Sequence, residues 1–406
     1  MTRTLLIGEK NSVQLLVAAA AVLAGFLWLP SPAAAQDVQE HALAGPEATF
    51  PEGFSRLSGM RELADGRVMV ADGLGQVLVI ADLASGAADT IGAEGQGPDE
   101  YREPDGLFVL PGDSTLLVDL GNGRLTAIAP DGSFGETTPI AQPAERGLLL
   151  VLPRATDSAG GIYFQQMGGM GSARGLPDSA AVVRFDRASG AYDTLALVKM
   201  PERKVSESGG GNERNVMMRP VPLSAEDAWS VGLDGRVAVA RAGTKQGEYW
   251  IDWFLPDGLA ISGTPTKYRP VKIGAAEKQE WVQNLGSDGL RVMITNDGGS
   301  MQASMSRGGG SRGLPDVDGF DWPDAMPAFT SNAVQVDPKG YAWVVRETAT
   351  DEAPLVDVFG PDGTLKARVR LPKACEIAGF GTHAVYLVRT DDLDFQWLER
   401  YELPTL

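Results

Sequence analysis

The feature that most constrains the fold of this chain is a pattern of short apolar strands that recurs six times. In each copy, a run of β-forming residues with alternating or continuous apolar character is followed by a second run of the same kind. The first runs cover residues 66–72, 114–119, 161–165, 235–240, 340–345 and 384–388, and the second cover 76–80, 124–128, 181–185, 249–254, 355–359 and 395–398. A unit this thin cannot bury both of its faces alone, so neighbouring units must cover one another. We therefore predict an all-β fold, a six-bladed β-propeller of four-stranded antiparallel blades.

Turn dipeptides follow the second run in five of the six units. They are Ser85-Gly86, Asp131-Gly132, Ser189-Gly190, Asp257-Gly258 and Asp362-Gly363. Glycine in such a pair supplies the positive φ of a tight hairpin, so each pair marks a further antiparallel strand. The sixth unit reaches residue 406 without one, and its blade therefore needs a strand from elsewhere.

The segment at 38–43 precedes the first complete unit and has no partner of its own. We expect this segment to complete the last blade, because a ring without open edges must be closed in this way. The alternatives are that the segment is a disordered leader and that the ring has seven blades.

Two stretches of the chain resemble a known repeat. Residues 92–101 combine a glycine-rich turn, acidic residues and Tyr101, and a proline-led strand follows at 104–109. Residues 332–344 are similar to the next part of the same repeat. In this respect the chain resembles the NHL-type or TolB-like six-bladed β-propellers of exported bacterial proteins. The resemblance implies a rigid platform that binds a protein, peptide or carbohydrate ligand at the mouth of the central channel.

The first 35 residues have the pattern of a cleaved secretory signal. Arg3 and Lys10 precede an apolar run at 13–29, and Ala33-Ala34-Ala35 provides a small-residue cleavage site. The alternative is a membrane anchor, since the run is at the lower limit of what crosses a bilayer. Cleavage would leave residues 36–406 as a single propeller domain that is periplasmic or secreted, monomeric and without a stable membrane span.

The net charge of −18 argues against some partners and the single cysteine against some cofactors. Nucleic acid and anionic lipid would be repelled by most of this surface. Cys375 is the only cysteine, so an internal disulfide and a cysteine-built zinc site are excluded. We expect Cys375 to be a small buried apolar residue.

Two irregular insertions, at 201–220 and 274–329, interrupt the repeat. Each follows an outermost strand and precedes the innermost strand of the next blade, so both should lie near the channel mouth. Long connections of this kind usually bind something or are disordered. Residues 275–285 form a helix candidate that could cap the channel.

The insertions are rich in arginine for so acidic a chain, and aromatic residues lie close by. Arginine pairs well with carboxylate or phosphate, and an aromatic wall could stack on a ligand. The alternative is that these arginines pair with the acidic surface. The candidate ligand-binding residues are Arg203, Arg214, Arg219, Trp281, Arg307, Arg312 and Trp322, with Phe320 beside them.

Catalytic residues are scarce. His41 and His383 are the only histidines, so no Ser-His-Asp arrangement can be assembled and a multi-histidine metal site is excluded. No cofactor is expected, except that Ca²⁺ could bind strand-end aspartates such as Asp72, Asp119 and Asp337, which are also ordinary turn formers. A binding module that is not an enzyme is favoured. The alternative is a Ca²⁺-dependent lactonase- or esterase-like hydrolase with its metal in the channel, and a purely structural envelope protein comes third.

Overall fold

The computed structural model describes residues 38–144, 147–166, 177–208, 215–243, 245–287, 290–297, 300–307 and 316–406. The predicted signal sequence, residues 1–35, lies outside them. The compact unit Gln39–Leu406 contains all the strands and helices named below. Within the described residues, no helix combines the length and the apolarity needed to cross a bilayer.

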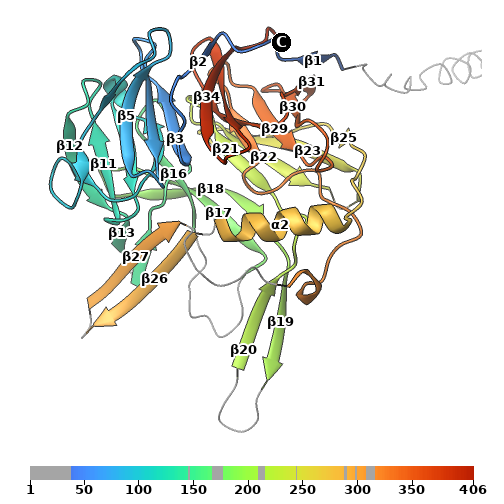
Figure 1. The fold of residues 1–406 in the computed structure, drawn as a ribbon. Coiled ribbons are helices and arrows are strands. Elements are labelled where there is room, and N and C mark those ends of the chain that lie inside the picture. Colours follow the sequence, from blue (N-terminus) through green and yellow to red (C-terminus); the bar gives the residue numbers. More distant parts are fainter. Residues whose placement is uncertain are drawn as a thin grey trace, which may run out of the picture. The chain divides into compact units, whose positions relative to one another are not determined.

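The first three blades are antiparallel sheets of four consecutive strands, ordered from the innermost strand outward (Figure 1). Blade one contains β3 (Leu57–Glu62), β4 (Val68–Asp72), β5 (Val77–Asp82) and β6 (Ala87–Thr90). Blade two contains β9 (Pro104–Val109), β10 (Thr115–Asp119), β11 (Arg124–Ile128) and β12 (Phe134–Pro139). Blade three contains β15 (Ala155–Thr156), β16 (Ile162–Gln166), β17 (Ser179–Phe185) and β18 (Tyr192–Lys199).

Blades four to six repeat the same order. Blade four contains β21 (Ala228–Val231), β22 (Val237–Ala242), β23 (Glu248–Phe254) and β24 (Ala260–Ser262), and β25 (Thr266–Lys267) also pairs with β23. Blade five contains β28 (Val334–Val336), β29 (Ala342–Arg346), β30 (Leu355–Phe359) and β31 (Leu365–Arg370). Blade six contains β32 (Cys375–Phe380), β33 (Ala384–Thr390), β34 (Gln396–Glu402) and β2 (Ala48–Thr49).

Six hydrophobic clusters of the described residues show how the blades are arranged. Each cluster joins two adjacent blades, and together they account for every junction around a ring of six. Tyr249 of blade four packs with Phe359 of blade five, and Val70 of blade one shares a cluster with Tyr386 of blade six. The protein is therefore a closed six-bladed β-propeller, and the alternative of seven blades is wrong.

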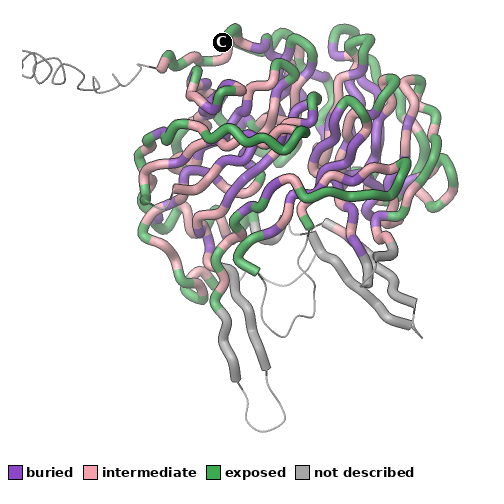
Figure 2. The backbone as a smooth tube through the Cα atoms, turned by 180° about the vertical axis from the view of Figure 1, so that it is seen from behind, coloured by how far each residue is buried: buried purple, intermediate pink, exposed green. Residues whose placement is uncertain are grey.

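The central strands read as continuous apolar runs because both of their faces are covered. All five residues of β4 and of β10 are buried, whereas all four residues of β6, at the outer edge, are exposed. Figure 2 shows the same pattern, with buried residues concentrated in the strands and exposed residues in the connections. A strand between two neighbouring blades does not need the polar alternation of a half-buried sheet.

The ring is closed by an N-terminal strand, as predicted, but by a different segment. β2 pairs antiparallel with β34, matching Ala48 with Arg400 and Thr49 with Glu399. The predicted segment 38–43 instead contains β1 (Glu40–Ala42), which pairs in parallel with β31 as a fifth strand of blade five. The assignment of closure to 38–43 is therefore wrong, and so is the alternative that this segment is a disordered leader.

The five predicted turn glycines all have positive φ. The angles are 75° at Gly86, 87° at Gly132, 70° at Gly190, 87° at Gly258 and 73° at Gly363. Each lies between the third and fourth strands of its blade, where the dipeptide pattern predicts a hairpin.

A second kind of turn recurs between the first two strands of a blade. In blade three, Asp157 accepts hydrogen bonds from the Gly161 amide at 2.8 Å and the Tyr163 hydroxyl at 2.8 Å. In blade five, Asp337 accepts from the Tyr341 amide at 2.9 Å and from Trp343 Nε1 at 3.0 Å. An aspartate thus links a turn to an aromatic residue six positions later in both blades.

Connections between blades carry the additional elements. Between blades one and two lie β7 (Ala93–Glu94), β8 (Glu100–Tyr101) and, within blade two, the short 3₁₀ helix η1 (Pro111–Asp113). Between blades two and three lies the hairpin β13 (Ala141–Ala144) and β14 (Gly147–Leu150), and between blades three and four the hairpin β19 (Arg203–Ser208) and β20 (Asn215–Pro220). Between blades four and five lie α2 (Ala275–Ser287), the hairpin β26 (Leu290–Asp297) and β27 (Ser300–Arg307), and the 3₁₀ helix η2 (Val317–Gly319).

The two predicted insertions are therefore more regular than expected, because each contains a hairpin. The helix candidate at 275–285 is confirmed as α2. Figure 1 shows α2 and the hairpins β19–β20 and β26–β27 on the same side of the blades. This is the side on which an outermost strand connects to the next innermost strand.

The longer insertion crosses the ring. Its two ends are joined between blades four and five, where the Met326 amide donates to the Val271 carbonyl at 2.8 Å. Met305 of β27 nevertheless packs into the cluster that joins blades two and three. The insertion thus contacts blade junctions that lie apart on the ring.

Candidate functional site

A cavity of about 650 Å³ lies between α2 and the ends of blades five and six. We call it the α2 cavity. Its walls come from one face of α2, the ends of β28 and β29, and the start of β32. The Gln335 side chain of β28 donates to the Ile377 carbonyl of β32 at 2.9 Å and joins the two blades at the cavity. A volume of this size is in the range of small-molecule sites.

The face of α2 that lines the cavity is polar. It presents Glu277, Glu280, Trp281 and Asn284, which are three or four positions apart and therefore lie on one side of a helix. A helix that only packs on a core would have an apolar stripe there. Val282, which is 2% exposed, is buried but is not part of the cavity lining. The face of α2 toward the cavity is thus suited to a polar ligand.

Acidic groups dominate the described lining. Glu347, Glu352 and Glu376 join the two glutamates of α2, and Arg346 is the one basic side chain among these lining residues. Burial raises the pKa of Glu347, the Thr330 side chain opposes this by hydrogen bonding, and the nearby charge of Glu280 raises it further. The site is therefore short of positive charge.

The charge of Arg346 is already neutralised. Its guanidinium donates to Asp357 at 3.0 Å and lies over the rings of Tyr249 and Tyr268, at 5.4 and 4.7 Å from their centroids. Asp357 is fully buried and also accepts from Arg368 at 3.1 Å and from the Tyr249 hydroxyl. Because Tyr249 belongs to blade four and Asp357 to blade five, this network joins two blades next to the cavity.

A second arginine crosses the channel mouth. Arg154, just before β15, donates to the Ser331 carbonyl at 2.8 Å and to Asn332 Oδ1 at 3.0 Å, next to β28. It also lies 4.9 Å from the ring centroid of Trp229. Burial lowers its pKa to about 10, against the opposing charge of Glu226. The starts of blades three and five are thereby held together.

The three aromatic residues singled out from the sequence form one cluster. Ring centroids lie 5.1 Å apart for Trp281 and Phe320, 5.5 Å for Trp281 and Trp322, and 6.0 Å for Phe320 and Trp322. The Lys278 ammonium lies 5.5 Å from the Trp322 ring centroid. Trp281 is the one member of this cluster that lines the cavity.

The candidate arginines are placed as follows. Arg203 begins β19, and its charge helps to oppose the rise in the pKa of Glu226 that burial causes. Arg219 and Arg307 lie in β20 and β27, but their side chains are outside the described part of the chain, and Arg214 and Arg312 lie outside the described residues altogether. No candidate arginine is among the described lining of the cavity, and anion binding by these arginines stays a prediction.

The strand-end aspartates already accept hydrogen bonds from their own turns and from neighbouring segments of the chain. Asp72 accepts from the Ser55, Arg56 and Gly75 amides at 2.6, 3.0 and 2.7 Å. Asp119 accepts from the Arg124 guanidinium at 3.1 Å and from Asn122 Nδ2 at 2.7 Å. In the described part of the chain, no group of three or more His, Cys, Asp or Glu side chains is arranged to hold a metal ion.

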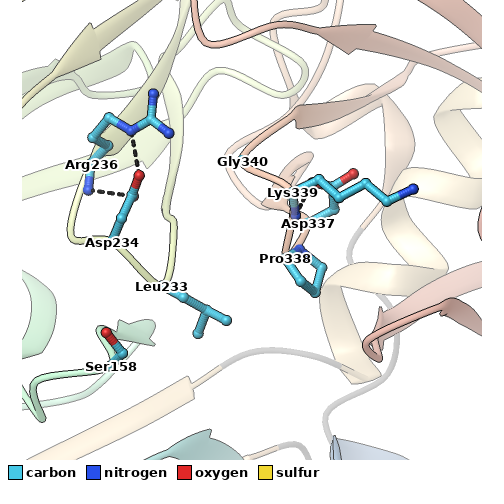
Figure 3. Close-up of a pocket in the computed structure, with 8 residues that line it drawn as sticks. All are labelled: Ser158, Leu233, Asp234, Arg236, Asp337, Pro338, Lys339 and Gly340. Carbon is cyan, nitrogen blue, oxygen red and sulfur yellow. Dashed lines mark hydrogen bonds and ion pairs between the residues drawn. The ribbon is translucent and has the colours of Figure 1, made fainter.

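A smaller cavity of about 270 Å³ lies at the opposite ends of the innermost strands, among the turns that follow β15, β21 and β28. Figure 3 shows Leu233, Asp234 and Arg236 on one side and Pro338 with Lys339 on the other. Arg236 donates to Asp234 at 2.5 Å. Since this arginine is already paired and the cavity is small, the α2 cavity is the better candidate site.

Known proteins are similar to this chain in structure but do not match it in sequence. No protein-family model matches the chain, and no curated protein matches its sequence. Solved structures similar to it include a member of the DUF4221 family from Bacteroides vulgatus, with 12% identity over 90% of this chain and 97% of that one and a TM-score of 0.48. A calcium-binding protein, regucalcin, from Agrobacterium tumefaciens has 12% identity over 90% and 97% and a TM-score of 0.41. A candidate exported protein from Bacteroides fragilis has 12% identity over 90% and 99% and a TM-score of 0.43. No activity is carried over from these similarities.

Proposed function

We propose that this protein is an exported binding module of NHL-like character that holds a protein, peptide or carbohydrate ligand in the α2 cavity. The observation that carries the proposal is the position and the polarity of α2 over the cavity. An inserted helix covers the ends of two blades and turns a polar face, with Glu277, Glu280 and Asn284, toward the space beneath it. Glu277 is half-buried in this face, whereas Glu280 and Asn284 are exposed, so the face is open to a polar ligand as well as to solvent.

The residues available favour binding over catalysis. His41 lies in β1 and His383 lies in an exposed turn, and neither lines the cavity. The described lining of the cavity therefore has no histidine to act as a general base beside its carboxylates or the Cys375 thiol. Export is supported by the signal-like pattern of residues 1–35.

The proposal is tested by thermal unfolding of the purified protein with three probes, which are a tripeptide mixture, a mixture of oligosaccharides, and Ca²⁺ compared with EGTA. A ligand that binds only the folded state stabilises it by about 2.7 kcal/mol at one hundred times its dissociation constant. We expect a peptide or oligosaccharide mixture to raise the unfolding temperature by several degrees.

A matched pair of variants locates the site. Thr348→Trp places an indole in the cavity lining, and Ala84→Trp places one on an exposed turn of blade one. The shift should disappear in the first variant and persist in the second. A shift that survives Thr348→Trp, or a shift with Ca²⁺ alone together with hydrolysis of a lactone, would contradict the proposal and favour the Ca²⁺-dependent hydrolase.

A further inference from the structure

The charge of the α2 cavity indicates the chemistry of its ligand. Glu277, Glu280, Glu347 and Glu352 line it in the described structure, together with Glu376, which has contacts of its own, and the single cation of this lining, Arg346, is already neutralised by Asp357. Glu347 is half-buried, and gathering further carboxylates around it is unfavourable unless a positive charge joins them. The cavity therefore favours a cation over an anion or a neutral sugar.

Two of these glutamates approach the cavity from different elements. Glu280 belongs to α2 and accepts from the Thr350 hydroxyl at 2.8 Å, whereas Glu347 directly follows β29 in blade five. Both line the same cavity, and the charge of Glu280 raises the pKa of Glu347. A cation held between helix and blade would relieve this repulsion.

The aromatic wall is suited to the same charge. Trp281 lines the cavity, and its neighbour Trp322 already carries an ammonium, that of Lys278, at 5.5 Å from its ring centroid. An ammonium over an indole face is a favourable cation–π arrangement. The cluster thus shows within this protein the contact that a ligand amine would make with Trp281.

The remaining lining indicates an organic cation. Met326, Val345 and Ile377 provide aliphatic surface beside the acids. A cavity of about 650 Å³ is far larger than a metal ion needs, and it has room for a methylene chain. The methylenes would contact the apolar side chains while the charged end meets the glutamates.

We propose that the α2 cavity binds the alkylammonium end of an aliphatic amine, with Glu280 and Glu347 as its counter-charges and Trp281 as its aromatic wall. This rests on the proposed function of the cavity as a ligand site. The amine belongs to a free diamine or polyamine, or to a lysine side chain of a peptide.

Isothermal titration calorimetry with four probes tests the proposal. The probes are cadaverine, Nα-acetyl-lysine amide, the five-carbon dianion glutarate and neutral 1,5-pentanediol, each at physiological salt, where charges on the open surface are screened beyond about 8 Å. We expect the two amines to bind and the dianion and the diol not to. The tighter of the two amines identifies a free amine or a peptide side chain as the source.

Variants distinguish a specific amine-binding site from the general attraction of cations to an acidic protein. Glu347→Gln should weaken cadaverine binding by about tenfold, as expected for loss of one charge-assisted contact. Glu94→Gln removes the same charge from the exposed strand β7 and should leave the affinity unchanged. Trp281→Leu should also weaken binding, with unfolding curves run on every variant to verify the fold.

The outcomes are distinct. Equal affinity in Glu347→Gln and Glu94→Gln, or no binding of either amine, overturns the cation proposal. Binding of glutarate that Thr348→Trp abolishes also overturns it, but leaves the cavity as a ligand site. The proposed function fails separately, if the thermal shift with the tripeptide or oligosaccharide mixture survives Thr348→Trp.

Discussion

Replacement of Asp357 should clearly lower the free energy of unfolding of this propeller. Its side chain is fully buried and accepts hydrogen bonds from Arg346, Arg368 and the Tyr249 hydroxyl. In Asp357→Ala the Arg346 side chain, only 7% exposed, would keep its charge without a partner, whereas Arg368, at 32%, could be hydrated. Breaking a buried pair from one side costs about 3–5 kcal/mol, and we expect a loss of that size.

Urea unfolding followed by tryptophan fluorescence measures this loss. The control is Asp321→Ala, which breaks an ion pair with Lys204 whose side chains are 66% and 61% exposed and should cost at most about 1 kcal/mol. The double variant Arg346→Met/Asp357→Leu removes both charges and should be more stable than Asp357→Ala. A cost for Asp357→Ala no greater than that of the control would refute the reasoning that the network holds blades four and five together.

Three further predictions follow from the backbone, the thiol and the closing strand. Gly258→Ala should cost about 1–2 kcal/mol of unfolding free energy, since φ is +87° and a Cβ there meets nothing within 4 Å. Gly363→Ala should cost more, because φ is +73° and its Cβ would also meet Gly263 Cα at 2.5 Å. Urea unfolding compares the two variants, and equal costs would contradict the prediction. The Cys375 thiol is 1% exposed, and burial raises its pKa to about 11. A thiol reagent at pH 8 should therefore react with Cys375 only as fast as the protein unfolds. Fast labelling of the folded protein would disprove this. A chain that starts at residue 45 keeps β2 and should fold. A chain that starts at residue 51 loses β2 and should unfold at a clearly lower urea concentration. Equal unfolding midpoints for the two chains would show that β2 does not close the ring.

The blades could be predicted from the sequence because their signals are local. The run of β5 is apolar from Val77 to Ala81 and is followed by a turn glycine at Gly86, and neither feature depends on distant residues. The closing strand was harder to predict. Segment 38–43 has the longer strand-like pattern, whereas closure needs only Ala48 and Thr49, which are too few to form a pattern.

The candidate site was predicted only in part. The aromatic cluster was visible because Phe320 and Trp322 lie close together and Trp281 lies on a helix candidate. The meeting of Glu280 with Glu347 was not, because the two are far apart in sequence and depend on where α2 crosses the blades. The one signal available in the sequence is the spacing of Glu277 and Glu280 along the helix candidate.

Ring closure by β2 also determines at what stage folding can be completed. Thr49 pairs with Glu399, so one of the first strands of the chain must wait for one of the last before blade six is complete. Contacts between residues so distant in sequence form late, since the entropy of closing the intervening chain is lost before the contacts compensate for it. During synthesis, the first five blades can thus form only an open arc, and the cooperative, fully closed state becomes accessible once the C-terminal residues have emerged.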